Sequence, residues 1–168
     1  HPSMNKCPGI DISTGSLGQG LACAVGMAIA GKADGKTYDV YAVLGDGECD
    51  EGEIWEAVGT AHKYQLDNLI IFVDVNGLQL DGTTDEILPH IDLGKKFEAF
   101  GFDVYKVDGH NCDELSKALK KTGEKPTCVI ANTIKGKGVS FIEGVKEWHH
   151  HTLSAEEYEQ AVKEVENV

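Results

Sequence analysis

The segment from residue 38 to residue 82 constrains the fold more than any other part of the chain, because strand, helix and strand signals follow one another within it. The run Tyr38–Leu44 is rich in β-branched and aromatic residues and ends at a glycine-rich acidic turn, which predicts a strand. Apolar residues recur at offsets of three and four through Glu51–Gln65, which predicts a helix with one apolar face. Leu69–Val73 predicts a second strand. A strand–helix–strand unit of this kind forms a parallel pair, so the sequence predicts an α/β fold.

The same alternation continues along the rest of the chain. The pattern predicts further helices over residues 17–30, 93–100, 112–122 and 154–165, and further strands over residues 102–107 and 127–132. This alternation is typical of a doubly wound, mostly parallel sheet with helices on both faces. A length of 168 residues with 41% hydrophobic content fits one such domain, covering residues 1–168.

Two polar side chains follow the two strands of the 38–82 segment. Asp46 lies in the turn Gly45-Asp46-Gly47 after the first strand, and Asn76 follows the second. Because parallel strands end at the same edge of a sheet, and neighbouring strands lie ~5 Å apart, we expect these side chains to meet there. A carboxylate and an amide oxygen suit a hard cation such as Mg²⁺, which takes a few protein ligands and leaves the rest to water and phosphate. The sequence therefore predicts a metal site, with two ordinary turns as the alternative for each motif taken alone.

The composition limits the classes of partner. A net charge of −13 argues against nucleic acid and anionic membrane, since both require basic surface. No apolar run approaches the ~20 residues that span a bilayer, and no signal peptide is recognisable. The five cysteines form no CxxC pair and are odd in number, which favours reduced thiols. We therefore expect a cytoplasmic protein.

Several motifs, in order along the chain, resemble those of the transketolase family of thiamine diphosphate enzymes. The spacing of Asp46 and Asn76 is similar to the thiamine diphosphate signature. The other matching motifs are Ser13–Gly20, Gly45–Glu48, Glu51-Gly52, Trp55-Glu56, Asp74–Asn76, Asp108–His110, Thr133–Gly138 and Trp148-His149. The resemblance covers the diphosphate-binding domain, called PP, and implies that the pyrimidine-binding domain is absent and that an amino-terminal segment is missing.

The resemblance also implies roles for individual residues. The implied metal ligands for Mg²⁺, or for Ca²⁺ or Mn²⁺, are Asp46, Asn76 and the backbone carbonyl of Leu78. The implied cofactor contacts are Gly15, Ser16, Leu17, Gly45, Asp46, Gly47, Glu51, Asn76, Lys135 and His149. The implied catalytic residues are His1, which would face the sugar donor, and His149. Glu51 and Glu56 match two glutamates at the family's subunit interface.

The function implied by the resemblance is transfer of a two-carbon ketol unit from a ketose phosphate to an aldose phosphate, as in the pentose phosphate pathway. The base-activating glutamate of this superfamily lies on the pyrimidine-binding domain, so we expect the isolated chain to be inactive. It would need a carboxyl-terminal partner subunit that carries that domain, in a homodimer or heterotetramer.

Three alternatives remain open from the sequence. A deoxyxylulose-phosphate-synthase-like enzyme would share the metal signature, and a panel of acceptors would distinguish it. A non-catalytic assembly module would show no metal-dependent binding of cofactor. An aspartate-based phosphatase would need an Asp-x-Asp nucleophile, but the segment Asp11-Ile12-Ser13 lacks the second aspartate.

Overall fold

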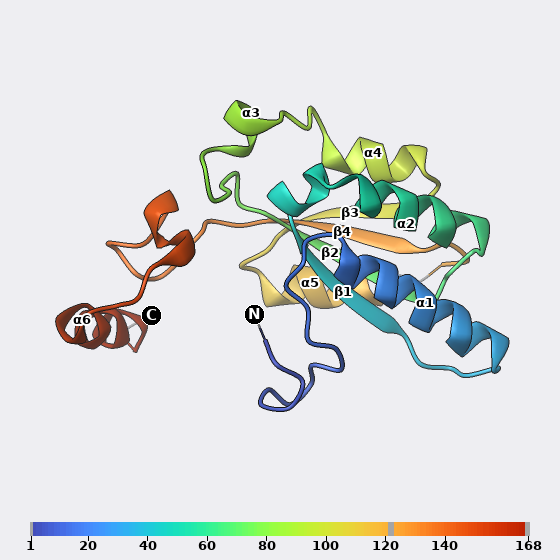
Figure 1. Ribbon diagram of the computed structural model, residues 1–168, viewed down its shortest axis with the longest axis horizontal. Coiled ribbons are helices and arrows are strands. Elements are labelled where there is room, and N and C mark those ends of the chain that lie inside the picture. Colours follow the sequence, from blue (N-terminus) through green and yellow to red (C-terminus); the bar gives the residue numbers. More distant parts are fainter. Residues whose placement is uncertain (1, 121–122, 167–168) are drawn as a thin grey trace.

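The fold is a four-stranded parallel sheet flanked by helices, in a computed structural model that describes residues 2–120 and 123–166. The strands are β1 (Val40–Gly45), β2 (Leu69–Val75), β3 (Asp103–Asp108) and β4 (Thr127–Asn132), in the spatial order β1-β2-β4-β3. All three neighbouring pairs are parallel. The predicted α/β class is therefore confirmed, and β1 and β2 are direct neighbours as expected (Figure 1).

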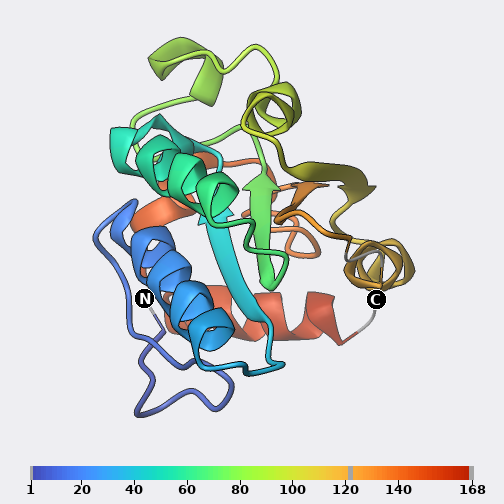
Figure 2. The ribbon, with the colours of Figure 1, turned by 90° about the vertical axis from the view of Figure 1, so that its right-hand side faces the viewer.

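Helices cover both faces of this sheet. On one side lie α1 (Gln19–Ala33), α2 (Gly52–Lys63) and α4 (Leu93–Ala99), and on the other lies α5 (Cys112–Leu119). Figure 2 shows α1 and α2 on one side of the strands and α5 on the other. The remaining elements are the short α3 (Thr84–Ile87), the 3₁₀ turns η1 (Gly47–Asp50) and η2 (Lys146–His150), and α6 (Ala155–Val165).

An aromatic cluster anchors α4 to the larger part of the core. Phe97 is completely buried, with its ring centroid 5.3 Å from that of Trp55 and 5.6 Å from that of Phe102. Trp55 also stacks on Phe100 at 5.7 Å. Because these rings come from α2, from α4 and from the start of β3, the cluster fixes α4 beside the carboxyl end of β1.

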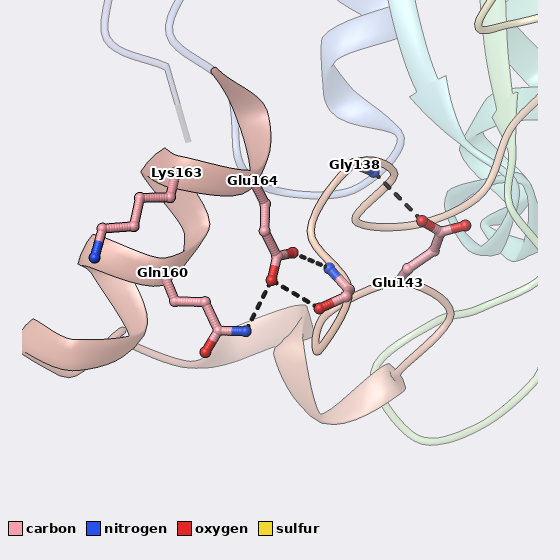
Figure 3. A pocket seen from close by; sticks show the side chains of 6 residues that line it. Gly138, Glu143, Gln160, Lys163 and Glu164 are labelled. Atoms are coloured by element: carbon pink, nitrogen blue, oxygen red, sulfur yellow. Dashed lines mark hydrogen bonds between the residues drawn. The ribbon is translucent and has the colours of Figure 1, made fainter. Parts of the chain in front are cut away.

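Helix α6 lies beyond the carboxyl edge of the sheet and is tied to the loop after β4. The Glu164 carboxylate accepts hydrogen bonds from the backbone amide and the hydroxyl of Ser140, and from the side-chain amide of Gln160. Figure 3 shows these contacts in an open polar hollow that is also lined by Gly138, Glu143 and Lys163. The hollow contains none of the predicted cofactor residues. Within residues 2–120 and 123–166, no helix has the length and apolar content that crossing a membrane requires.

The predicted boundaries need small corrections. Strand β1 starts at Val40 because Tyr38 turns toward α1, where its hydroxyl donates to the carbonyl of Met27 at 3.3 Å. Helix α2 starts at Gly52 because the four preceding residues of η1 form a tight turn of their own. Helix α5 ends at Leu119, and residues 121–122 of the predicted helix lie outside the described residues.

Candidate functional site

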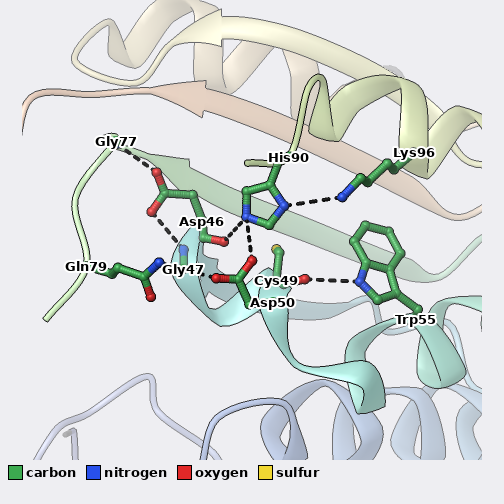
Figure 4. A network of polar contacts seen from close by, with 9 residues as sticks. All are labelled: Asp46, Gly47, Cys49, Asp50, Trp55, Gly77, Gln79, His90 and Lys96. Atoms are coloured by element: carbon green, nitrogen blue, oxygen red, sulfur yellow. Dashed lines mark hydrogen bonds and ion pairs between the residues drawn. The ribbon is translucent and has the colours of Figure 1, made fainter. Parts of the chain in front are cut away.

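The loops after β1 and β2 meet at the carboxyl edge of the sheet. Gly45 pairs with Asp74 in the strand register, so Asp46 and Asn76 leave neighbouring strands almost side by side. The backbone amide of Gly77 donates to Oδ2 of Asp46 at 2.7 Å, which joins the two loops directly (Figure 4). The predicted meeting of these loops is confirmed.

The Asp46 carboxylate is buried, with only 2% of the residue exposed. Its second oxygen, Oδ1, accepts from the backbone amide of Gly47 at 2.9 Å. Burial raises the pKa of Asp46, the Gly77 and Gly47 amides oppose that rise, and the charge of Asp74 adds to it. Each carboxylate oxygen keeps a free acceptor position. A divalent cation at this edge would relieve the buried negative charge, so the donor set fits a metal ion electrostatically.

Asn76 and Leu78 contribute oxygens from the second loop. The side-chain oxygen of Asn76 accepts from the amide of Leu78 at 3.0 Å, and its side-chain nitrogen donates to Asp74 at 3.3 Å. The bridge between Leu78 and Thr83 uses the flanking backbone groups, so the carbonyl of Leu78 takes no part in its hydrogen bonds. No cluster of three or more His, Cys, Asp or Glu side chains suited to a metal occurs among the described residues. An ion here would therefore rely on amide, backbone and non-protein oxygens, as Mg²⁺ commonly does.

Glu48 ties a third loop to this edge, and sequence reasoning assigned it no role. Its Oε1 accepts from the amide of Gly18 at 3.0 Å, and its Oε2 accepts from the amide of Gly45 at 3.2 Å. Gly18 has a φ of 85°, in the left-handed region that favours glycine, and it directly follows the exposed residues Gly15, Ser16 and Leu17. The Glu48 carboxylate thus holds the predicted Gly15–Leu17 contact loop beside the Asp46 turn.

Replacing Glu48 by glutamine is expected to weaken this connection. A glutamine side chain has one acceptor oxygen, so its amide group would face one of the two backbone amides that Glu48 now accepts from. We expect the free energy of unfolding to fall by about 1–3 kcal/mol, the cost of leaving a partly buried donor without an acceptor. Urea unfolding measures the loss. The exposed Glu56→Gln is the matched control, and equal unfolding midpoints for the two variants would contradict the role of Glu48.

The loop after β4 brings Lys135 and His149 toward each other. Its start is fixed, because the amide of Thr133 donates to the carbonyl of Val75 at 3.0 Å and the amide of Ile134 donates to Nε2 of His110 at 2.8 Å. Partial burial and the charge of Lys135 lower the pKa of His149. The side chain of Lys135 therefore lies close enough to His149 for their charges to interact, on the strand edge that also carries Asn76.

Other predicted site residues lie apart from these contacts. Glu51 is the N-cap of α2 and its side chain caps no backbone amide, so it stands before the first turn of the helix and not within it. Glu51 and Glu56 are both exposed. The predicted role of His1 lies outside the described residues.

The comparison with known families uses the whole length of this domain. Residues 1–166 match the family described as transketolase, thiamine diphosphate binding domain. The chain belongs to this family. The predicted membership is confirmed, and a thiamine diphosphate-binding domain is what the family description states.

The relatives of this thiamine diphosphate-binding domain include proteins that form one subunit of a transketolase. It is 47% identical over 169 residues to one such protein, from the apulose-4-phosphate transketolase of Actinobacillus succinogenes, covering 99% of this chain and 61% of that protein. It is also 47% identical over 169 residues to the 6-deoxy-6-sulfo-D-fructose transketolase subunit SqwG of a Clostridium species, covering 99% of this chain and 62% of that protein. The domain thus spans about three fifths of the length of these relatives.

A solved structure gives the same result for the fold. The crystal structure of transketolase from Campylobacter jejuni superposes with a TM-score of 0.86 at 35% identity, covering 94% of this chain and 26% of that one. The match places the four-stranded sheet and its flanking helices within the transketolase architecture.

Proposed function

We propose that this chain is the cofactor-binding part of a transketolase-type transferase, which binds Mg²⁺–thiamine diphosphate and transfers a two-carbon ketol unit between sugar phosphates. The observation that carries the proposal is the buried Asp46 carboxylate, hydrogen-bonded to Gly77 directly beside Asn76. A buried carboxylate with free acceptor positions, at the edge where two parallel strands end, is suited to a cation that bridges protein and diphosphate.

Each predicted residue has a defined task in this proposal. Asp46, Asn76 and the carbonyl of Leu78 hold the metal ion, and the backbone of Gly45 and Gly47 allows close approach of the diphosphate. The loop Gly15–Leu17 and Glu51 contribute to the cofactor site, Lys135 neutralises phosphate charge, and His149 contacts the reacting end together with His1. When bound, thiamine diphosphate supplies a carbon nucleophile and accepts the electron pair released from the sugar.

The net charge of the chain makes the metal and Lys135 important. With a formal charge of −13, the domain as a whole repels a diphosphate, so attraction must be local. Lys135 and the divalent ion provide that local positive charge.

A second polypeptide completes the active site in this proposal. Relatives of similar sequence are named as one subunit of a transketolase, which suggests that a separate polypeptide carries the pyrimidine-binding domain. We propose that the partner supplies the base-activating glutamate and that the assembly is a homodimer or a heterotetramer. The 168-residue chain alone would then be inactive. A cytoplasmic location, with substrates of the pentose phosphate type or the more specialised sugars named for the relatives, accompanies this proposal.

A reconstitution experiment tests the proposed function. The chain is co-expressed with the product of the adjacent reading frame that encodes a pyrimidine-binding domain, and ketol transfer is measured with a panel of aldose phosphate acceptors. Activity is expected for the pair and not for either polypeptide alone. Activity of the isolated chain would contradict the proposed division of labour, and use of glyceraldehyde phosphate with pyruvate as donor would favour a deoxyxylulose-phosphate-synthase-like enzyme.

Calorimetry separates the enzyme from a non-catalytic assembly module. Titration of the chain with thiamine diphosphate in the presence of Mg²⁺ is expected to release heat that disappears when EDTA removes the metal. An assembly module would show no metal-dependent heat.

The raised pKa of Asp46 predicts that cofactor binding releases protons. Burial raises that pKa, so at mildly acidic pH more of this carboxyl is protonated than of an exposed aspartate. A metal ligand must be ionised, so binding expels the proton, and affinity should fall by up to about tenfold per pH unit as the pH drops below the raised pKa. Titrations with magnesium-saturated cofactor, in two buffers of different ionisation enthalpy, count the protons. Proton release that does not increase on acidification would contradict this assignment.

A further inference from the structure

His90 is a buried side chain at the metal loop, and none of the roles above accounts for it. It lies between α3 and α4, and only 8% of the residue is exposed. Its Nε2 is 3.0 Å from the backbone oxygen of Asp46 and 3.0 Å from Oδ1 of Asp50. Its other nitrogen, Nδ1, is 3.3 Å from the ammonium of Lys96 (Figure 4).

The contacts of His90 define which ring nitrogen carries the proton. An ammonium group has only donors, so Nδ1 must accept the hydrogen bond from Lys96. The ring proton is then on Nε2, which donates toward the Asp46 carbonyl and Asp50. The same Asp46 carbonyl also accepts from the amide of Cys49 at 3.1 Å, which closes the turn η1. The histidine therefore occupies the second acceptor position of the carbonyl around which the metal loop folds.

The peptide unit between Asp46 and Gly47 connects this contact to the predicted metal ligand. The unit is planar, so its carbonyl and its amide turn together. His90 holds the carbonyl, and the amide of Gly47 donates to Oδ1 of the Asp46 carboxylate at 2.9 Å. Fixing one end of this plane therefore fixes the direction of the carboxylate at the other end.

Two further side chains hold the rest of the turn. The indole nitrogen of Trp55 donates to the carbonyl of Cys49 at 3.0 Å, and the side-chain amide of Gln79 donates to Oδ2 of Asp50 at 3.2 Å. Lys96 also lies over the Trp55 ring, 5.4 Å from its centroid. Figure 4 shows His90, Trp55 and Gln79 approaching the turn from three different elements.

We propose that His90 is a positioning residue that orients the Asp46 carboxylate for metal binding, with Lys96 fixing the proton of His90 on Nε2. This inference rests on the proposed function, because it concerns the same metal site. His90 touches neither metal nor cofactor and acts through the Asp46–Gly47 peptide. Residues that orient metal ligands in this way typically change metal affinity by about 10–100-fold when they are removed.

The test compares two substitutions at the same position. His90→Gln keeps a donor near the place of Nε2, whereas His90→Leu fills the volume and provides no donor. We measure amide hydrogen exchange at Gly47 and Cys49 in the ligand-free domain, and the dissociation constant for Mg²⁺–thiamine diphosphate. For His90→Leu we expect exchange at these amides to be at least about tenfold faster and affinity about tenfold weaker. For His90→Gln we expect both values to stay within about threefold of the wild type.

A purely structural role predicts a different result. It would accelerate exchange equally at the β4 amides of Val129 and Ile130, and glutamine would perform no better than leucine. Either outcome would overturn the inference, as would unchanged exchange and affinity in His90→Leu.

A second pair of variants keeps the test decisive if His90→Leu does not fold. Lys96→Met removes the donor to Nδ1 but keeps an unbranched stem over Trp55, and Lys95→Met on the exposed side of α4 is its control. Exchange at Gly47 and Cys49 should accelerate about threefold in Lys96→Met and stay unchanged in Lys95→Met. Identical behaviour of the two lysine variants would overturn the inference.

Failure of the proposed function has a separate signature. If the wild-type domain binds no cofactor in a metal-dependent manner, the proposed function fails. The exchange measurements need no ligand, so they still decide whether His90 orders the Asp46 turn.

Discussion

Replacing Asp46 by asparagine is expected to abolish magnesium-dependent binding of thiamine diphosphate, with a loss of affinity of at least about 100-fold. Removing one member of a buried charge pair typically costs about 2–5 kcal/mol, and 2.7 kcal/mol corresponds to about 100-fold. The substitution removes the negative charge that the metal needs. It also places a side-chain amide against one of the backbone amides of Gly47 and Gly77, which now donate to the carboxylate. Isothermal titration of the variant with cofactor, with and without Mg²⁺, measures the effect.

The matched control for Asp46→Asn is Asp34→Asn. Asp34 is exposed and caps the carboxyl end of α1, so it has the same chemistry without the burial. We expect the control to bind cofactor with wild-type affinity. If both variants bind cofactor equally well, Asp46 is not a metal ligand and the proposed function loses its main support.

Replacing Phe97 by alanine is expected to lower the free energy of unfolding by about 3–5 kcal/mol, the usual cost of truncating a fully buried aromatic side chain. Phe97 is completely buried and its ring contacts Trp55 and Phe102. The cavity would lie between α2, α4 and β3, where the backbone of two packed helices cannot close it. Denaturant unfolding followed by circular dichroism measures the change.

Phe100 provides the comparison for this prediction. It stacks on the same Trp55 ring, but 36% of it is exposed, so Phe100→Ala creates an indentation in the surface and not a closed cavity. We expect it to cost less than half as much as Phe97→Ala. Equal losses would show that the aromatic cluster is less tightly packed than the ring distances indicate.

The sequence predicted the fold where the signals are local. The strand–helix–strand unit around α2 follows from residue spacing alone, and so does the placement of Asp46 and Asn76 at one edge. The order β1-β2-β4-β3 did not follow from local patterns, because the insertion of β4 between β2 and β3 depends on packing between segments far apart in the chain.

The supporting contacts of the candidate site could not be predicted in the same way. Glu48 reaches back to Gly18, and His90 reaches back to Asp46. No spacing rule connects such distant residues, and a lone histidine in a polar loop is usually exposed. Glu48 did lie within a recognised motif, so its position gave a signal, but its partners did not. His90 became visible only through its burial and its two hydrogen-bonding nitrogens.

The strand order has a consequence for the sequence of folding events. Strands β1 and β2 pair through a short crossover, whereas β2 must wait for β4, which pairs Ile70 with Thr127. Closing the longer loop costs more chain entropy, so the β2–β4 pairing is expected to form later. Asp46 and Asn76 belong to the early unit, and Lys135 follows the strand that completes the sheet. The chain therefore acquires its predicted metal ligands before the lysine that would neutralise phosphate, and a nascent or partly refolded molecule would capture a cation sooner than the intact cofactor.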